Sequence, residues 1–467
     1  MKGHVAGALR WRDLPSAWLH WRRRGDASGE DFRAAFARSL GLEADAVQLF
    51  GSGRAALHAF VASLQLPAGS EVLLPGYTCV VVPNVFMHLG LAVRYVDIRP
   101  DDFNPTADDW SAAIGPATRL VVVPHNFGQV TEGLDALKRR HPQVVFVEDA
   151  AHAWGGIDRT GRIAGTLGDA AFFSFEFSKP LTTGTGGALV IADPAQRQRF
   201  AAHRPVLHRP AGGVVRRQLL TLGWHRLTMS LPRAALHLLT GLLRIPSRML
   251  GLVAKTPDSE ISGDSQPDYR AGLHPLSAAV GLMQARRFES LYQLRRQQTA
   301  DYDDLFVDLP GWQRLTGATG TGSRHETDDQ DRTGMPSPSP SAPTPTPTPA
   351  STSTSTSSRG KVMSQPVLLR YPLLLPSAAL RDAVIRELEA IGLVGGTWFD
   401  DVVHPRGSHR YGYAQGQCPN GERAACTVLN LPMGLHARLS ARQRAALRAI
   451  AERHGGRWSR HGGEGSA

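Results

Sequence analysis

Lys179 stands where a side-chain amine could react. It follows an apolar run, 170–175, within Ser174-Phe-Glu-Phe-Ser-Lys179, and precedes a turn rich in threonine and glycine, 182–187. Lysines are mostly solvated, so a single lysine at a strand end is weak evidence. Partial burial lowers the pKa of an ammonium group, however, and the neutral amine can form a Schiff base with a carbonyl compound. Lys179 is therefore a candidate reactive amine if suitable partners lie near it.

Two carboxylates close an earlier apolar run, 143–149. Glu148 and Asp149 end this run, and His152 follows them. A cap for the next helix is one interpretation of these carboxylates. The other is that Asp149 faces the ring nitrogen of a ligand, because a neighbouring carboxylate raises the pKa of that nitrogen and keeps it protonated.

A small-residue turn, Gly51-Ser52-Gly53-Arg54, precedes the helical pattern 54–64. Free backbone N–H groups and the helix dipole converge at such a helix start and favour a phosphate. The Ser52 hydroxyl and the Arg54 guanidinium would add to this attraction. Any strand-to-helix turn could use the same small residues, so the turn alone indicates little.

These residues lie at or near the ends of predicted strands, which alternate with helical patterns such as 54–64 and 134–140. Apolar strands separated by helices predict an α/β fold with a mainly parallel sheet covered on both faces. Ligands of such sheets bind at the carboxyl ends of the strands. The predicted strands are 71–74, 92–98, 119–125, 143–149, 170–175 and 187–191.

The chain divides into parts of different composition. An N-terminal extension, 1–29, precedes a large domain, 30–215, and a smaller C-terminal α/β domain is predicted over 256–460. Residues 317–360 are polar and rich in proline, serine and threonine, which predicts a disordered insert within the small domain.

Residues 216–255 form a leucine-rich, basic insertion with helical periodicity. One interpretation is a helical pair packed on the body or in a dimer contact. The other is an amphipathic surface in weak contact with anionic lipid.

Composition sets limits on the partners. The net charge of +11 favours anionic partners, but the basic residues are scattered and no basic stripe with interleaved aromatics occurs, so we do not expect nucleic-acid binding. The three cysteines lack the spacing of a disulfide framework or a zinc site, and we expect no metal. No signal peptide or membrane-spanning run is evident, so the cytoplasm is the expected location.

Taken together and in order, these motifs resemble the DegT/DnrJ/EryC1/StrS family of fold-type-I enzymes that depend on pyridoxal phosphate (PLP), the sugar aminotransferases. The resemblance covers most of residues 30–455. It is carried by Gly53-Arg54, Glu148-Asp149-Ala-Ala, Ser174-Phe175 to Lys179 with Gly186-Gly187, Pro124-His-Asn-Phe-Gly128, the segment 392–404, and Leu431-Pro-Met-Gly-Leu.

The resemblance implies a seven-stranded, mainly parallel sheet, a homodimer and a role for each matching residue. Lys179 would hold PLP as a Schiff base and move the proton, and Asp149 would pair with the pyridine nitrogen. His152 stands where the family usually has glutamine near the 3′-oxygen of the cofactor. Phosphate binding is implied for Ser52, Gly53, Arg54 and Ser174, and the loop over the active site would bring His125 to the substrate.

Three departures from the family pattern are evident. Cys79 stands where the family has an aromatic residue stacked on the cofactor. Either Cys79 covers the cofactor ring as a small apolar group, or Tyr77 is a substitute; Tyr77 is also a candidate substrate contact. Arg54 stands in place of threonine in the phosphate turn. The family's Asn-Tyr-Arg, which reaches a neighbouring subunit's phosphate, is Asp268-Tyr-Arg270 here, and an acidic residue would repel phosphate.

The implied activity is transfer of an amino group from an amino acid, with glutamate expected, to a keto-sugar that is expected to be nucleotide-linked. Such a reaction belongs to polysaccharide or secondary-metabolite biosynthesis. Three alternatives stay open: a catalytically idle PLP-binding regulator or scaffold, a PLP-dependent sugar dehydratase, and a dinucleotide-dependent oxidoreductase. Lys179 disfavours the dehydratase, because family dehydratases have histidine there, and the absence of Gly-x-Gly-x-x-Gly after the first strand disfavours the oxidoreductase.

Overall fold

The structure is a computed structural model that describes residues 7–228, 258–263, 267–307, 309, 366–409 and 411–458. The predicted insert 317–360 and residues 229–255 of the leucine-rich segment lie outside these ranges. Within them, every helix is too short or too polar to be a transmembrane segment.

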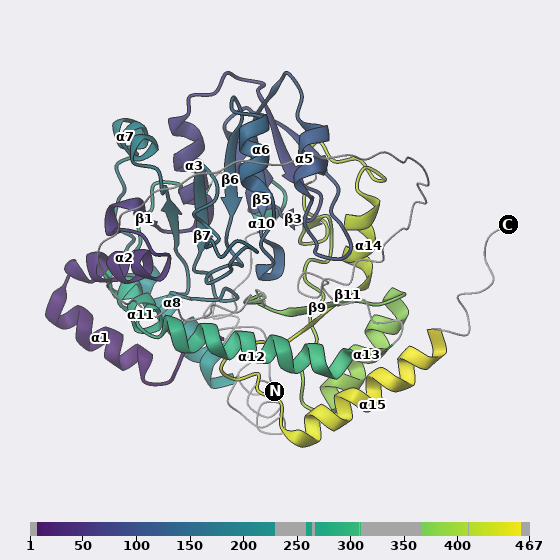
Figure 1. The fold of residues 1–467 in the computed structure, drawn as a ribbon. Coiled ribbons are helices and arrows are strands. Elements are labelled where there is room, and N and C mark those ends of the chain that lie inside the picture. The colour runs from purple at the N-terminus through teal and green to yellow at the C-terminus, as the bar shows by residue number, and fades with distance from the viewer. Residues whose placement is uncertain are drawn as a thin grey trace, which may run out of the picture.

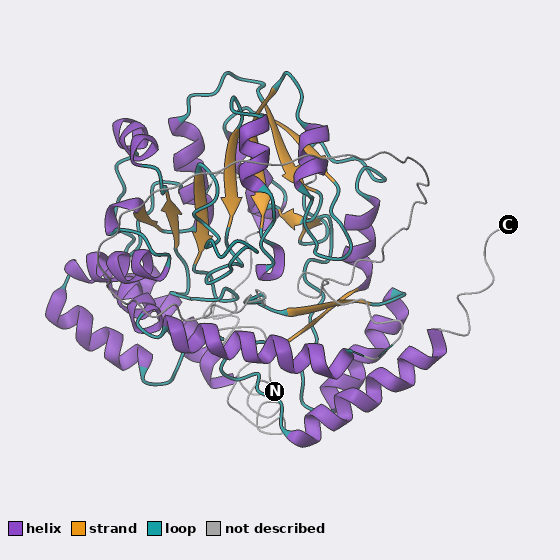
Figure 2. Cartoon of the chain, in the orientation of Figure 1, coloured by secondary structure: helices purple, strands orange, loops and turns teal. Residues whose placement is uncertain are grey.

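A seven-stranded sheet forms the centre of the larger part of the molecule (Figure 2). Its order is β1-β8-β7-β6-β5-β2-β4, and all neighbouring strands from β7 to β4 run parallel. Strand β8 runs antiparallel to both β7 and β1. The strands are β1 Val47–Phe50, β2 Glu71–Pro75, β4 Ala92–Val96, β5 Thr118–Pro124, β6 Val145–Asp149, β7 Ala170–Ser174 and β8 Gly187–Val190.

The predicted mainly parallel sheet is confirmed, and each of the six predicted strands is present. Strand β1 is not among the predicted strands. It has four residues and leads directly into Gly51-Ser-Gly, so the sequence there reads as a turn. The predicted helices 54–64 and 134–140 correspond to α3 Gly53–Ser63 and α6 Leu134–Arg140.

Helices cover both faces of the sheet (Figure 1). Strand β7 contributes side chains to both faces, because successive side chains of a strand point to opposite sides of the sheet. Phe172 lies in the core beneath α3, whereas Phe173 lies in a second core with Phe36 of α2. The helices of this part are α1 Asp13–Arg24, α2 Ala27–Ser39, α3, α4 Val81–His88, α5 Ala107–Ala113, α6, α7 Pro194–His203, α8 Gly212–Thr228, α10 Asp258–Ile261 and α11 Pro275–Ala285.

A smaller part with its own core follows helix α12 Phe288–Phe306, which runs beneath the sheet in Figure 1. A two-stranded antiparallel sheet, β9 Tyr371–Leu374 with β11 Val428–Leu431, packs against helices there. Those helices are α13 Ala378–Ala390, α14 Pro419–Thr427 and α15 Ala441–Trp458.

One strand pair joins the two parts. Strand β10 Val403–His404 runs parallel to β3 Thr78–Cys79, and His404 is opposite Cys79. The C-terminal part therefore reaches the edge of the sheet where β6 and β7 end.

Candidate active site

Lys179 is in the turn after β7 with its amine among polar groups. Its Nζ lies 3.1 Å from His152 Nε2 and 4.7 Å from the centre of the Trp398 ring. Burial lowers the pKa of Lys179, while the carboxylates of Glu176 and Asp149 oppose that shift. A lysine so placed reaches its neutral, nucleophilic form more easily than a solvated one.

Asp149 is the last residue of β6, on the strand beside β7. Its Oδ1 accepts a hydrogen bond from the Ala151 backbone N–H at 3.1 Å. Burial raises the pKa of Asp149, and the nearby Lys179 charge opposes the rise. A second cation, such as a protonated ring nitrogen, would stabilise its charged form further.

The adjacent Glu148 points to the other face of the strand and has a structural role. Its carboxylate is fully buried and accepts hydrogen bonds from the backbone N–H groups of Gly165, Leu167 and Gly168, each at 2.7 Å. His125 Nε2 donates a fourth bond at 2.8 Å. The alternation of side chains along β6 thus separates a structural carboxylate from the one beside Lys179.

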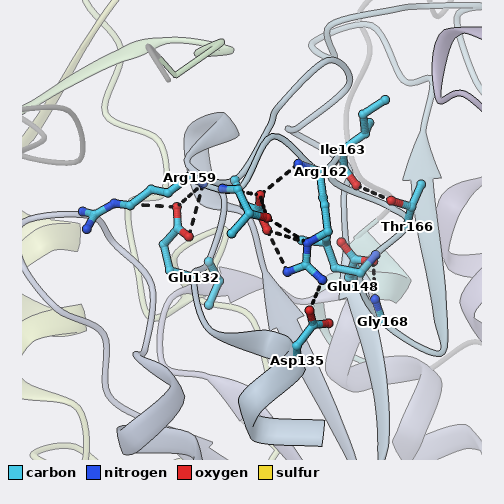
Figure 3. A network of polar contacts seen from close by, with 12 residues as sticks. Glu132, Asp135, Glu148, Arg159, Arg162, Ile163, Thr166 and Gly168 are labelled. Carbon is cyan, nitrogen blue, oxygen red and sulfur yellow. Dashed lines mark hydrogen bonds and ion pairs between the residues drawn. The ribbon is translucent and has the colours of Figure 1, made fainter. Parts of the chain in front are cut away.

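The loop that supplies those N–H groups is held by its own polar contacts (Figure 3). Arg162 pairs with Asp158 at 2.8 Å and also with Asp135, and the Thr166 hydroxyl donates to the Ile163 carbonyl at 2.7 Å. Gly165 has a φ of +91°, and a Cβ there would lie 2.4 Å from the Phe173 ring. Glycine is therefore required at this point of the loop.

His125 does not lie where a substrate could use its ring, contrary to the expected contact. Its Nδ1 accepts from the Thr131 backbone N–H at 3.1 Å and its Nε2 is bonded to Glu148, so both ring nitrogens are engaged. The side chain is also fully buried. His125 therefore positions the strand ends.

His152 is buried against Lys179. Its Nδ1 accepts from the Phe127 backbone N–H at 3.3 Å, so in the neutral ring the proton is on Nε2 and points to Lys179 Nζ. That arrangement requires the lysine amine to accept, as only the neutral amine can. Burial, with the charges of Lys179 and Arg370, lowers the pKa of His152 well below its usual value.

The start of α3 lies against the ends of β7 and β8. Ser52 caps the helix by accepting from the Ala55 backbone N–H at 3.2 Å. A Cβ on Gly53 would lie 3.2 Å from Ser174 Cβ, and a Cβ on Gly187 would lie 2.4 Å from the Gly53 nitrogen. The predicted phosphate residues Ser52, Gly53 and Ser174 are thus brought together at a helix N-terminus.

Arg54 already has an anionic partner. Its Nη1 lies 2.7 Å from Oε2 of the buried Glu260 in α10, whose backbone carbonyl accepts from Asn84 Nδ2 at 2.9 Å. Burial raises the pKa of Glu260, and the Arg54 charge lowers it. Sequence reasoning did not identify Glu260, because α10 has only four residues and no motif around it.

Cys79 and Tyr77 have different surroundings. Cys79 lies within electrostatic reach of Lys179, Arg54 and Asp149, and burial raises the pKa of its thiol, which is therefore neutral. Tyr77 is fully buried, and its hydroxyl donates to the Phe399 carbonyl at 3.0 Å and accepts from the Phe399 N–H at 2.9 Å. Tyr77 therefore has no free face for a substrate or a cofactor ring, contrary to the expectation.

Two large side chains beside Lys179 were not predicted. The Trp398 ring lies 4.6 Å from the His152 ring and 3.9 Å from the Arg370 guanidinium, measured between ring centres and to Cζ respectively. Trp398 Nε1 donates to His404 Nε2 at 2.9 Å, and His404 Nδ1 lies 2.6 Å from Asp400 Oδ1. Trp398 and His404 fall within the segment 392–404, but no spacing within that segment indicated that Trp398 contacts Lys179 or that His404 orients the Trp398 ring.

These residues fit PLP. Lys179 offers an amine for its aldehyde, Asp149 a carboxylate for its ring nitrogen, and the glycine-lined start of α3 a cradle for its phosphate. Glycine at 53 and 187 lets the start of α3 pack this closely on the sheet, because a Cβ on Gly53 would lie 3.0 Å from the Phe173 carbonyl oxygen and one on Gly187 would lie 2.4 Å from the Gly53 nitrogen.

The chain is similar in sequence to known aminotransferases. The model of the DegT/DnrJ/EryC1/StrS aminotransferase family matches residues 16–217. The dTDP-4-dehydro-2,3,6-trideoxy-D-glucose 4-aminotransferase of Saccharopolyspora spinosa is 31% identical over 290 residues, which cover 60% of this chain and 63% of that protein. The L-glutamine:2-deoxy-scyllo-inosose aminotransferase of Streptomyces kanamyceticus is 38% identical over 152 residues, 32% of this chain and 35% of that protein.

The alignments thus span less than two thirds of either relative. A solved structure extends the likeness at the level of the fold. The aminotransferase TlmJ from Streptoalloteichus hindustanus superposes with a TM-score of 0.64 at 22% identity, covering 98% of this chain and 100% of that one. The chain thus shares the fold of this aminotransferase, and its residues 16–217 are similar to the DegT/DnrJ/EryC1/StrS aminotransferase family.

Proposed function

We propose that this protein is a PLP-dependent aminotransferase that moves an amino group from an amino acid to a keto-sugar. The observation that carries the proposal is the Lys179 amine, which is largely buried, lies 3.1 Å from His152 and is within electrostatic reach of Asp149. PLP, when bound, supplies an aldehyde that captures amines and a ring that accepts electrons from the neighbouring carbon.

The chain's own residues would divide the remaining tasks. Lys179, once free, moves a proton to and from the reacting carbon, and its lowered pKa favours the neutral amine that this requires. Asp149 holds the ring nitrogen protonated. His152 fixes Lys179 by a hydrogen bond and covers one side of the site with Trp398. Ser174 and the start of α3 would hold the phosphate.

The relatives support the substrate class. One of them is named for a dTDP-linked keto-sugar and the other for a keto-cyclitol with L-glutamine as donor. We propose a nucleotide-linked keto-sugar as acceptor and glutamate as donor, in polysaccharide or secondary-metabolite biosynthesis. Purified acceptors of this class, added to the aminated enzyme, would identify the substrate by mass spectrometry of the product.

Absorbance spectroscopy tests the activity directly. Protein supplied with PLP should develop a visible band, which should be lost on addition of glutamate and return on addition of the keto acceptor. Absence of the band from PLP-supplemented protein, together with a spectrum unchanged in Lys179→Ala, would contradict the proposal.

A catalytically idle PLP-binding protein is the second candidate. The specific observation in its favour is that Arg54, at the phosphate turn, is already paired with Glu260. Half-reactions separate the two candidates, because an idle protein would bind PLP and keep its visible band with every amino donor.

We also propose that the protein is a homodimer in the cytoplasm. Three large apolar side chains at or near α1 and α8 are exposed, namely Trp11, Trp18 and Leu220. Their exposure supports a contact between this region and a second subunit. Weak contact of 216–255 with anionic lipid is the alternative use of this region. Sedimentation would detect the dimer, and flotation with anionic vesicles would detect the lipid contact.

A further inference from the structure

Arg370 is a buried cation whose charge is not neutralised. Its side chain has no hydrogen bond or ion pair with any described residue, although the residue is only 7% exposed. Its Nε is fully buried without a partner. Burial lowers the pKa of Arg370 to about 9. An uncompensated charge of this kind is costly to bury, so its presence indicates a ligand of opposite charge.

The described surroundings offer aromatic contact but no carboxylate in reach. The Arg370 guanidinium lies 3.9 Å from the centre of the Trp398 ring, and this cation–π contact offsets only part of the desolvation cost. Glu176 is the carboxylate whose charge raises the pKa of Arg370, yet its Oε2 already accepts hydrogen bonds from the backbone N–H of Ser178 at 3.0 Å and from the Ser178 hydroxyl at 2.7 Å.

Arg370 also lies close to the reactive amine. The Trp398 ring contacts both cations, Arg370 at 3.9 Å and Lys179 at 4.7 Å from its centre. The two cations are therefore no further apart than the sum of those distances. The charge of each one also lowers the pKa of His152. A small anion that binds Arg370 can therefore extend toward Lys179.

We propose that Arg370 binds the α-carboxylate of the amino-acid donor; this inference rests on the proposed aminotransferase function. The planar guanidinium matches a carboxylate with two parallel hydrogen bonds. An amino acid held in that way places its amino nitrogen roughly 6 Å from the guanidinium carbon. That distance is within the upper limit that the two contacts with the Trp398 ring set for the separation of Arg370 and Lys179. The phosphates of a nucleotide-linked acceptor are several bonds further from their reacting carbon than an α-carboxylate is.

Two variants of the PLP-loaded enzyme test the assignment. Arg370→Gln should raise the KM for L-glutamate in the donor half-reaction by at least about thirtyfold, because a buried charge pair loses one member. Arg370→Lys keeps the positive charge but cannot form two parallel hydrogen bonds with a carboxylate. It should therefore bind glutamate more tightly than Arg370→Gln and less tightly than the parent. A readout independent of turnover is the affinity for glutarate, a dicarboxylate that cannot react, which calorimetry should find weakened in Arg370→Gln.

Two comparisons keep the result specific. 4-Aminobutyrate lacks the α-carboxylate of glutamate, so its half-reaction should be equally slow in the parent and in Arg370→Gln. Arg295→Gln is the matched control, since Arg295 is also buried but donates from Nη1 to the Leu368 and Leu369 carbonyls. It should lower the melting temperature without changing the KM for glutamate.

Failure of this inference differs from failure of the proposed function. A parent enzyme with no visible PLP band would overturn the function and the inference with it. An Arg370→Gln variant that keeps the band and the parent's KM for glutamate would overturn only the inference. So would a variant whose KM rises for the keto-sugar acceptor alone.

Discussion

Arg54, at the start of α3, and Arg370, near Lys179, are set in opposite electrostatic surroundings. Arg54 lies at the start of α3 and forms an ion pair with Glu260 at 2.7 Å, whereas Arg370 has no ion pair with any described residue. An arginine that is already neutralised contributes mainly to the fold, while a buried unpaired one has its binding capacity unused. The two ends of one site thus differ in what they can still bind.

The adjacent carboxylates Glu148 and Asp149 repeat this difference. Glu148 accepts hydrogen bonds from four donors and has no capacity left, while Asp149 has one backbone donor and the nearby Lys179 charge. In both pairs, the residue with fewer partners is the one that faces the proposed ligand.

Replacing Lys179 should have the largest effect, since its amine is the reactive group of the proposed site. Lys179→Ala should lower kcat for transamination by at least about a thousandfold, because the group that moves the proton is lost. Rapid-mixing absorbance with glutamate would measure this loss. A variant within tenfold of the parent would show that another group does the chemistry.

Glu260→Gln tests whether Arg54 is held by its ion pair. Since Arg54 is partly exposed, loss of the pair should lower the free energy of unfolding by about 1–2 kcal/mol. The freed guanidinium should at the same time bind the PLP phosphate more tightly. Chemical denaturation and PLP titration measure the two effects.

The outcome that contradicts this view is weaker PLP binding in Glu260→Gln. It would mean that Arg54 acts on the phosphate only while Glu260 holds it in place. Glu289→Gln, on the exposed first turn of α12, serves as the control for loss of a glutamate outside the site.

Trp398 contacts both Arg370 and Lys179, so its removal should weaken binding of the donor more than binding of PLP. Trp398→Leu should lower kcat/KM for glutamate by about tenfold through loss of the cation–π contacts. PLP affinity, which depends on the α3 end, should change less. His404→Gln should have a smaller effect in the same direction, because His404 only orients the indole at 2.9 Å. Equal losses at both ends would remove the distinction between them.

The smallest expected effect concerns the stability of α3, the helix that carries Arg54. This part of the fold should be destabilised by acid. His58 stacks on Tyr269 at 3.9 Å, and burial lowers the pKa of His58 from 6.5 to about 4. The unfolded chain therefore takes up a proton at this histidine below pH 6.5 while the folded chain does not, so stability falls as pH drops from 6.5 to about 4.

His58→Phe keeps an aromatic ring at this position and cannot titrate. Its melting temperature should fall less than the parent's over that pH interval, by about 1–2 °C. Parallel curves for parent and variant would exclude His58 as a source of the acid sensitivity.

Much of the fold followed from local pattern. Alternation of apolar strands with helices predicted the parallel sheet, since period-two and helical patterns are set by short-range geometry. Strand β1 was not predicted, because four residues are too few to show the alternation of apolar and polar side chains that marks a strand. The domain boundaries at 29, 215 and 255 stay predictions, and α2 Ala27–Ser39 runs through the first of them.

The sequence by itself determined which residues end each strand of the sheet. Lys179, Asp149, His152, Ser52, Gly53 and Ser174 were identified in this way, because neighbouring parallel strands bring their carboxyl ends to one edge. Their exact roles toward PLP stay predictions.

Only the tertiary structure decided which polar groups have partners and which do not. Glu260 neutralises Arg54 across more than two hundred residues of chain, and both nitrogens of His125 and the hydroxyl of Tyr77 are used within the protein. Arg370 and Trp398 reach Lys179 from the C-terminal part through the pairing of β10 with β3. Whether a charge is satisfied depends on distant segments that fold against it, and no local spacing records that.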